Sequence, residues 1–151
     1  MKNPIRHLWR VLDVCVPVML LYIGAYLAPA DFWFTNNSFI ISNSTLGVSP
    51  TVNEDRTIHR SFYGSYSYST RDAKTGTVMF SCTGYSELRY KGGLSGVETS
   101  TLIEYAGIRT GCAYLPKGSY YGEVCRTVLE PFWGLVPPKR KCWISNLFEI
   151  Q

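Results

Sequence analysis

Apolar residues follow two patterns along this chain: a continuous run near the start and an alternation with polar residues afterwards. The run extends from Val14 to Ala30 (VCVPVMLLYIGAYLAPA) without a charged residue. An α-helix needs about 20 mostly apolar residues to cross a bilayer core of about 30 Å. The pattern therefore predicts one N-terminal transmembrane helix over residues 11–30, with membrane lipid as its partner.

The charges around this run predict its orientation. Three basic residues lie in the first ten positions, whereas Asp13 is the sole acidic residue before residue 31. Basic residues favour the cytoplasmic side, so residues 1–10 are expected to be a cytoplasmic tail. The chain is then a single-pass protein of the inner (cell) membrane with a periplasmic C-terminal domain. The alternative is a cleaved signal peptide, because Ala28-Pro29-Ala30 fits a small-x-small cleavage site; both interpretations export the remainder.

Beyond residue 60, hydrophobic and polar positions alternate with the period of a β-strand. Between Ser61 and Thr70, Gly64 and several aromatic residues share one face and serines the other, which predicts a half-buried antiparallel strand. Turn residues at 72–76 separate it from an apolar run at Thr77–Thr83, so the two are expected to form a hairpin. Further strands are predicted at Phe39–Ser42, Ser86–Tyr90, Thr99–Tyr105, Ser119–Leu129 and Cys142–Ile150.

These runs predict an all-β fold after the N-terminal helix. About six to eight short strands in about 100 residues, without sustained helical periodicity, are typical of an immunoglobulin-like antiparallel β-sandwich. We assign the sandwich to residues 56–151, as an exported domain. Residues 31–55 are rich in Asn, Ser and Thr and are predicted to be a juxtamembrane stalk with one embedded strand. At Leu115–Tyr121, Pro and Gly precede a tyrosine at the start of a strand, as in a tyrosine corner.

Cysteine positions support export. Cys15 lies in the apolar run, and the other four, Cys82, Cys112, Cys125 and Cys142, lie beyond it. Four cysteines in a small exported domain predict two disulfides. Strand parity places Cys142 on a core-facing side, opposite Cys125 in the last hairpin, and this leaves Cys82 with Cys112. A bridge between an early and a late strand, as in immunoglobulin domains, remains the alternative.

Charge and histidine content exclude several function classes. The net charge is +4, but residues 31–151 carry nearly balanced charges, so no nucleic-acid partner is expected. His59 is the one histidine outside the basic tail, and an acid on the same strand-like run, such as Asp55, does not by proximity give the geometry of a catalytic site. The cysteine spacings contain no Cys-x2-Cys pair. We therefore expect a non-enzymatic protein with no catalytic residue, cofactor or metal.

The most unusual segment is Pro131–Pro138 (PFWGLVPP), which Lys139-Arg140-Lys141 follows directly at the predicted tip of the last hairpin. Its prolines block ladder hydrogen bonds, and its large apolar side chains need cover. One interpretation is a protein-recognition loop with a basic rim. A second lets the loop dip into a membrane surface, and a third folds its aromatic residues back onto the core. The candidate partner-binding residues are Phe132, Trp133, Leu135, Val136, Lys139 and Arg140.

Three segments carry a resemblance to a known group of proteins. The run DRTIHRSFYGSYSYS (Asp55–Ser69), the segment LPKGSYYGEVC and the ending SNLFEI resemble small single-pass membrane proteins of unknown function encoded in tailed-bacteriophage genomes. The resemblance implies a product that faces the periplasm of a Gram-negative host, and it carries over no catalytic residue.

The expected function is protein–protein interaction by a membrane-anchored periplasmic β-sandwich. Its partner would be an unidentified envelope or phage protein, in phage–host envelope contact or superinfection, and a homo-oligomer stays open. The alternative is a secreted or virion-associated structural protein that is released after signal cleavage at Ala30.

Overall fold

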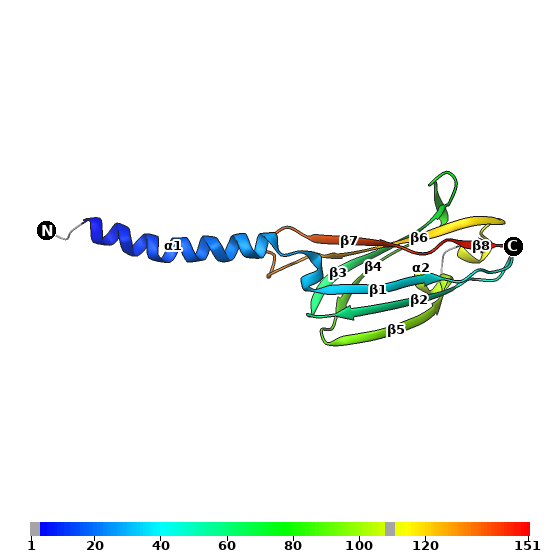
Figure 1. Cartoon of the computed structure of the whole chain (residues 1–151), viewed down its shortest axis with the longest axis horizontal. Helices are drawn as coiled ribbons and strands as arrows, with labels where there is room; N and C mark the ends of the chain where they lie inside the picture. Colours follow the sequence, from blue (N-terminus) through cyan, green and yellow to red (C-terminus); the bar gives the residue numbers. More distant parts are fainter. Residues whose placement is uncertain (1–3, 108–110) are drawn as a thin grey trace.

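A computed structural model describes the backbone of residues 4–107 and 111–151, and the side chains of these residues from Leu12 onward except Ala113. The chain forms a long helix, α1 (Pro4–Leu27), that projects from one end of a domain built of two antiparallel sheets (Figure 1). A short 3-10 helix, η1 (Ala30–Phe32), connects them. The predicted antiparallel β-sandwich is confirmed.

α1 confirms the helical part of the prediction for residues 11–30. The helix is 24 residues long and contains Pro17. Its predicted transmembrane role is not confirmed, since no helix among the residues the structure describes is both long enough and apolar enough to cross a membrane.

The smaller sheet corrects the predicted stalk. It has the order β1-β2-β5, with β1 at Phe34–Ile41, β2 at Thr51–Ile58 and β5 at Leu94–Thr101. Residues 31–55 are therefore largely part of the sandwich, and the predicted boundary at residue 56 falls inside β2. The polar composition concealed these strands because β2 places an acid, Glu54, among its inward-facing residues.

The larger sheet has the order β4-β3-β6-β7, and β8 pairs with the other end of β6. β3 and β4 form the predicted hairpin, but β4 is one continuous strand where the sequence predicted two. The predicted last strand is divided into β7 and β8. The bounds are Phe62–Asp72 for β3, Val78–Tyr90 for β4, Gly118–Val128 for β6, Lys139–Ile144 for β7 and Phe148–Ile150 for β8.

A short helix replaces the end of the strand predicted at Thr99–Tyr105. α2 (Leu102–Ala106) begins with a capping box, in which the Thr101 hydroxyl accepts from the Glu104 N–H and the Glu104 carboxylate accepts from the Thr101 N–H. These bonds satisfy free N–H groups at the first turn of the helix. The strand therefore terminates at Thr101. A second 3-10 helix, η2 (Cys112–Tyr114), follows.

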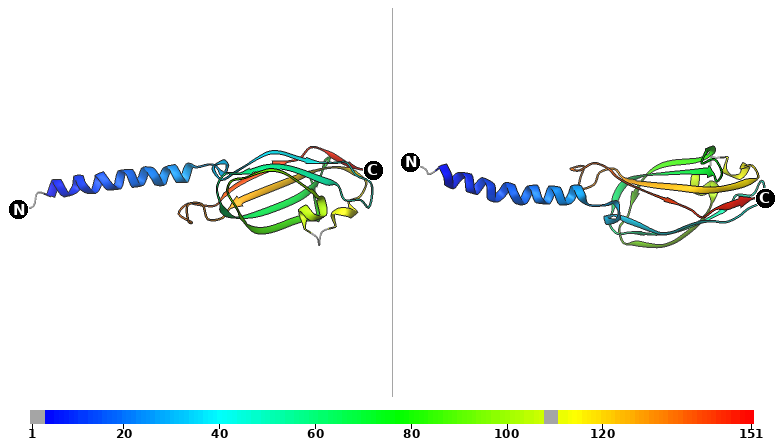
Figure 2. Two further views of the ribbon diagram at one scale, coloured as in Figure 1. Left: turned by 90° about the horizontal axis from the view of Figure 1, so that it is seen from below. Right: turned by 45° about the horizontal axis from the view of Figure 1, so that its top comes forward.

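The sandwich is closed along one side and open along the other. On the closed side, Ser44 bridges to Ile150 in parallel, and the Asn146 amide bonds both the N–H and the C=O of Ile41, at 2.8 and 3.0 Å. On the other side, β5 ends one sheet and β4 ends the other, and no strand within residues 4–107 and 111–151 joins them. Figure 2 shows the two layers from further directions.

Both predicted disulfides are present, Cys82–Cys112 and Cys125–Cys142. Cys125 and Cys142 are direct cross-strand partners in the β6–β7 pair, as predicted. The predicted face was wrong, because Cys142 is exposed and its neighbour Trp143 packs inward on Phe34. The pairing holds because direct cross-strand partners lie on the same face of the sheet, where Cys125 is buried and Cys142 is exposed.

Candidate functional site

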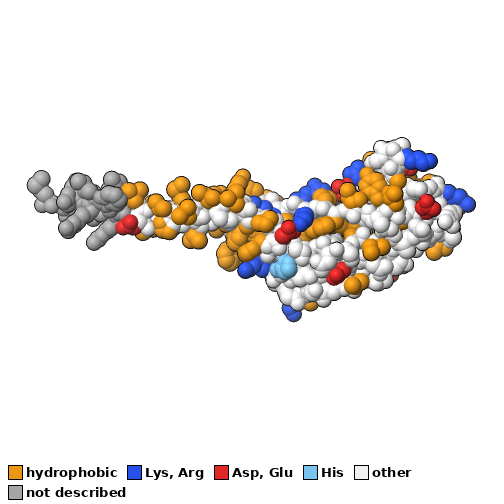
Figure 3. Space-filling model, in the orientation of Figure 1, with side chains coloured by type: hydrophobic (Ala, Val, Ile, Leu, Met, Phe, Trp, Pro, Cys, Tyr) orange, Lys and Arg blue, Asp and Glu red, His pale blue; other side chains and the backbone are white. Residues whose placement is uncertain are grey.

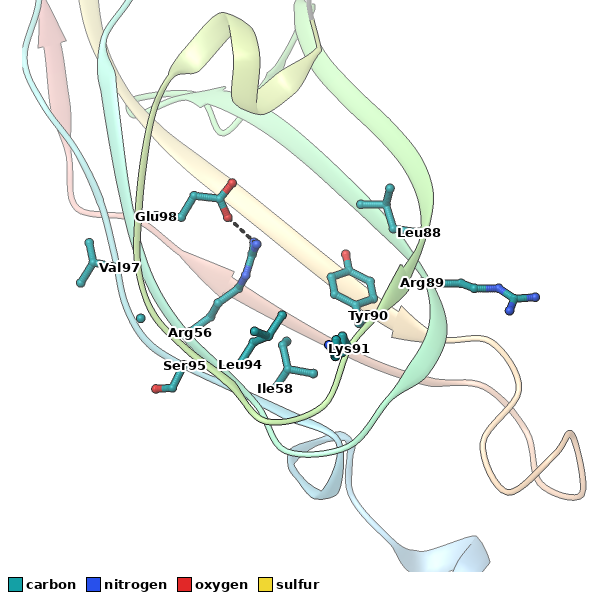
Figure 4. Close-up of a pocket in the computed structure, with 11 residues that line it drawn as sticks. Arg56, Ile58, Leu88, Arg89, Tyr90, Lys91, Leu94, Ser95, Val97 and Glu98 are labelled. Atoms are coloured by element: carbon teal, nitrogen blue, oxygen red, sulfur yellow. Dashed lines mark ion pairs between the residues drawn. The ribbon is translucent and has the colours of Figure 1, made fainter.

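A groove runs along the open side of the sandwich, between the edge strands β4 and β5. It consists of two adjoining hollows of about 400 and about 640 Å³, which share Arg56, Leu88, Tyr90 and Glu98. Figure 4 shows Arg56 and Glu98 on one wall, Leu88 and Tyr90 on the other, and Arg89 turned away. The groove exists because the sheets have no strand in common at this side.

A buried ion pair joins the two sheets next to the groove. The Arg126 guanidinium on β6 donates two hydrogen bonds of 2.6 Å, one to each carboxylate oxygen of Glu54 on β2. Arg126 is 1 % exposed and Glu54 is fully buried. Bidentate, charge-assisted geometry of this kind is the strong form of an ion pair, and here it links β6 of one sheet to β2 of the other.

Three further side chains satisfy the Glu54 carboxylate. Asn36 and Tyr105 donate to it at 2.7 and 3.0 Å, and Arg56 lies 3.2 Å from it while also pairing with Glu98 at the groove surface. Burial lowers the pKa of Arg126, but the hydrogen bonds and the negative charge of Glu54 outweigh burial and raise that pKa overall. Arg126 is therefore charged throughout the physiological range.

Tyrosines surround this pair and line the second hollow. The rings of Tyr66 and Tyr105 pack edge to face at 5.4 Å, and the Tyr66 hydroxyl donates to the Tyr105 carbonyl at 2.6 Å. The Arg126 guanidinium lies 5.7 Å from the Tyr66 ring centroid. Burial, above all other causes, raises the pKa of both phenols above the ordinary value. Both hydroxyls are therefore neutral hydrogen-bonding groups.

The raised phenol pKa values predict loss of stability in alkali. The unfolded chain releases its tyrosine protons near pH 10, whereas Tyr66 and Tyr105 keep theirs in the folded state. Their contribution is fully present below about pH 10 and is lost as the pH rises above it. Urea unfolding between about pH 9 and pH 12 should show this fall, with a shallower slope in Tyr105→Phe. An identical slope in the variant would contradict the assignment.

The chemistry of the groove suits binding. Among the described residues, neither a histidine nor a cysteine lines it. His59 lies elsewhere, with its Nε2 atom 3.1 Å from the Thr35 hydroxyl. The groove instead offers aromatic rings, hydroxyls and the Arg56–Glu98 pair, groups that are able to stack on a ligand and to form hydrogen bonds with it.

One group of potential metal ligands occurs in the described part of the chain: Glu123, Cys125 and Cys142. Its two sulfurs are bonded to each other, so neither is a thiolate that could bind a metal.

The predicted loop residues divide between the core and the surface. Val136 is buried, and Phe132 packs on Phe32 and Trp33 with ring centroids 5.7 and 5.2 Å apart. Phe132 thus folds back as one interpretation expected. Trp133 and Leu135 are 91 % and 66 % exposed, contrary to that interpretation, and Lys139 and Arg140 begin β7 beside them.

The loop lies at the end of the domain from which α1 projects (Figures 1 and 2). The Lys139 ammonium donates to the carbonyl of Tyr26 in α1, and Lys141 forms an ion pair with Asp31 in η1. A hollow of about 800 Å³ lies between Phe132 and the last turns of the helix. The tertiary structure therefore joins the loop and the helix into one surface.

Sequence reasoning missed Glu54, Arg126 and Tyr105. The available signal was parity, because each charged residue lies two positions from a buried valine and so shares its face. Glu54 follows Val52 in this way on β2, and Arg126 follows Val124 on β6. A charged residue at an inward position predicts a buried partner of opposite charge. The sequence does not indicate which two residues meet.

Comparisons with known proteins add no family. No protein-family model matches the chain, and a search of curated proteins returns no significant match.

Proposed function

We propose that this protein is a non-enzymatic interaction domain that α1 holds in a lipid membrane. The main support is the apolar surface of α1, where the side chains of the consecutive residues 18–23 are 45–76 % exposed. Six consecutive helical positions cover every side of a helix. A helical stretch that is apolar on every side favours an apolar environment, and Figure 3 shows hydrophobic side chains of α1 beyond the sandwich.

The two disulfides support a location outside the cytosol. Such bonds persist in oxidising compartments, and the periplasm of a Gram-negative host fits both this chemistry and the phage resemblance. The immunoglobulin-like classification belongs to the same proposal. It is supported by the Tyr120 hydroxyl, which donates to the Pro116 carbonyl at 2.8 Å, as in a tyrosine corner.

The partner surface in this proposal is the groove between β4 and β5. Edge strands present free backbone groups that can pair with another chain, and most proteins protect them with Lys or Pro. β5 contains neither residue, and its one charge, Glu98, is paired with Arg56. An extended segment of an envelope or phage protein could add to this edge and place side chains on Tyr90 and Leu88.

Photo-crosslinking in expressing cells tests the proposal. A photoreactive residue replaces Leu88, which lines both hollows, and the matched control replaces Phe80, which lies on the same strand, is 85 % exposed and lines neither. We expect the full-length chain in the carbonate-resistant membrane fraction, with a discrete adduct from position 88 alone. Equal labelling from both positions, or a soluble chain that begins after Ala30, would contradict the proposal.

A further inference from the structure

We propose that the loop of residues 129–138, between β6 and β7, docks on the surface of a lipid bilayer, with Trp133 and Leu135 among the lipid headgroups. This inference rests on the proposed function, because it requires α1 to lie in the same bilayer. It assigns a lipid ligand to two of the candidate partner-binding residues, and of the three interpretations of this loop it develops the one in which the loop dips into a membrane surface.

Position is the first support. The loop is held at the base of α1 by the ring contacts of Phe132, tilted on Phe32 and edge-to-face on Trp33, and by the bond from Lys139 to the Tyr26 carbonyl. A bilayer that surrounds α1 therefore meets this end of the domain first (Figures 1 and 2). The groove, by contrast, opens along the side of the sandwich.

The conformation of the loop presents the indole outward. Phe132 and Trp133 both have left-handed backbone angles, with φ of 50° and 59°, and Gly134 follows at 79°. Bulky residues rarely adopt this conformation, because Cβ approaches the carbonyl oxygen. Phe132 and Val136 pack inward on either side of Trp133, whose side chain is 91 % exposed. The loop thus adopts an unfavourable backbone conformation that exposes Trp133, the largest side chain among residues 129–138.

The surrounding charges favour anionic lipid. Arg60 lies over the Phe32 ring at 4.1 Å, and Lys139 and Arg140 begin the adjacent strand. Asp31, an acid at this end, is neutralised by Lys141, and Glu130 is the other acid in the loop region. Indole rings and cations together are typical of the headgroup region of a membrane. Continuity with the lipid around α1 favours a bilayer over a protein as the occupant.

Quenching by brominated lipid tests the inference on the full chain. The protein is reconstituted into vesicles of phosphatidylcholine and phosphatidylglycerol that carry bromine on the acyl chains near the headgroups, and flotation is measured on the same samples. We expect the vesicles to quench tryptophan emission, and Trp133→Phe to remove a quenched, blue-shifted component. Trp143→Phe is the matched control, because Trp143 is half-buried against Phe34 and should contribute no quenched component.

A second variant tests the charge. Arg140 is exposed and, on anionic vesicles, Arg140→Ser should reduce the quenching of Trp133, whereas on pure phosphatidylcholine it should have little effect.

The outcomes separate this inference from the proposed function. Chains that float with equal quenching in the wild type and Trp133→Phe would overturn the loop docking and leave the α1 anchor intact. Chains that do not float would overturn both. Trp133 emission that shifts only when envelope protein is added would assign the loop to a protein partner instead, and would also overturn the inference.

Discussion

Glu54→Gln is expected to lower the free energy of unfolding by about 3–5 kcal/mol, the cost of leaving one member of a buried ion pair without its counter-charge. Arg126 is 1 % exposed, and its guanidinium donates two hydrogen bonds to the Glu54 carboxylate. Glutamine keeps the shape but removes the charge and replaces one acceptor with a donor. Urea unfolding monitored by circular dichroism measures the change.

The matched control is Glu98→Gln on the neighbouring strand. Glu98 also pairs with an arginine, Arg56, but its side chain is about half exposed. Exposed pairs contribute about 0–1 kcal/mol, so this variant should unfold almost like the wild type. Equal effects at the two positions would show that the buried pair does not determine the stability of the sandwich.

A double replacement tests whether the buried ion pair stabilises the fold or instead fixes one arrangement of the two sheets. Buried ion pairs can often be exchanged for apolar residues of similar size at little cost, because desolvation offsets their attraction. Glu54→Leu combined with Arg126→Met should therefore regain much of the lost stability. The Tyr105 hydroxyl and the Asn36 amide would lose their shared acceptor, so recovery should be incomplete and the groove wall should loosen.

Removal of the Cys82–Cys112 disulfide is expected to cause the second large loss of stability. Replacing both cysteines with alanine should cost about 3–4 kcal/mol, because the bond closes a loop with a sequence separation of 30 and both sulfurs lie in the core. The bond also holds η2 against β4, where the Gly111 N–H donates to the Ser81 carbonyl at 2.6 Å.

The control for this prediction is the other disulfide. Cys125–Cys142 closes a loop with a sequence separation of 17, across two strands that the β6–β7 ladder already aligns. Its removal should cost less, by about 0.5 kcal/mol or more from the shorter loop alone. Chemical denaturation of both double-alanine variants measures the order, and a reversed order would contradict this account.

The positions of the strands in the larger sheet followed largely from the sequence, although β4 was predicted as two strands and β7 with β8 as one. In β3, Phe62, Gly64, Tyr66 and Tyr68 face inward as the pattern predicts. β2 was missed because its alternation runs through Glu54 and Arg56, which are polar residues at inward positions. Hydrophobic periodicity detects a strand only where burial and apolarity coincide.

The Cys142 error has a related cause. The face of a short edge strand depends on its register with β6 and on the chain path between β7 and β8, and neither is a property of local sequence. A shift of one residue reverses the side of every residue in a strand. The partner of Cys142 was nevertheless correct, because cross-strand neighbours change sides together.

By itself the sequence determined the helical N-terminal run and the all-β character of the remainder, because these depend on periodicity along the chain. It favoured the observed pairing of the cysteines, and the structure decided that pairing against a bridge between an early and a late strand. Only the tertiary structure decided that residues 34–58 belong to the sandwich, that Glu54 meets Arg126, and that the Trp133 loop shares one end with α1. Each of these depends on contacts between segments far apart in sequence. Their free energy comes from burial and charge pairing across the two sheets, which no local pattern records.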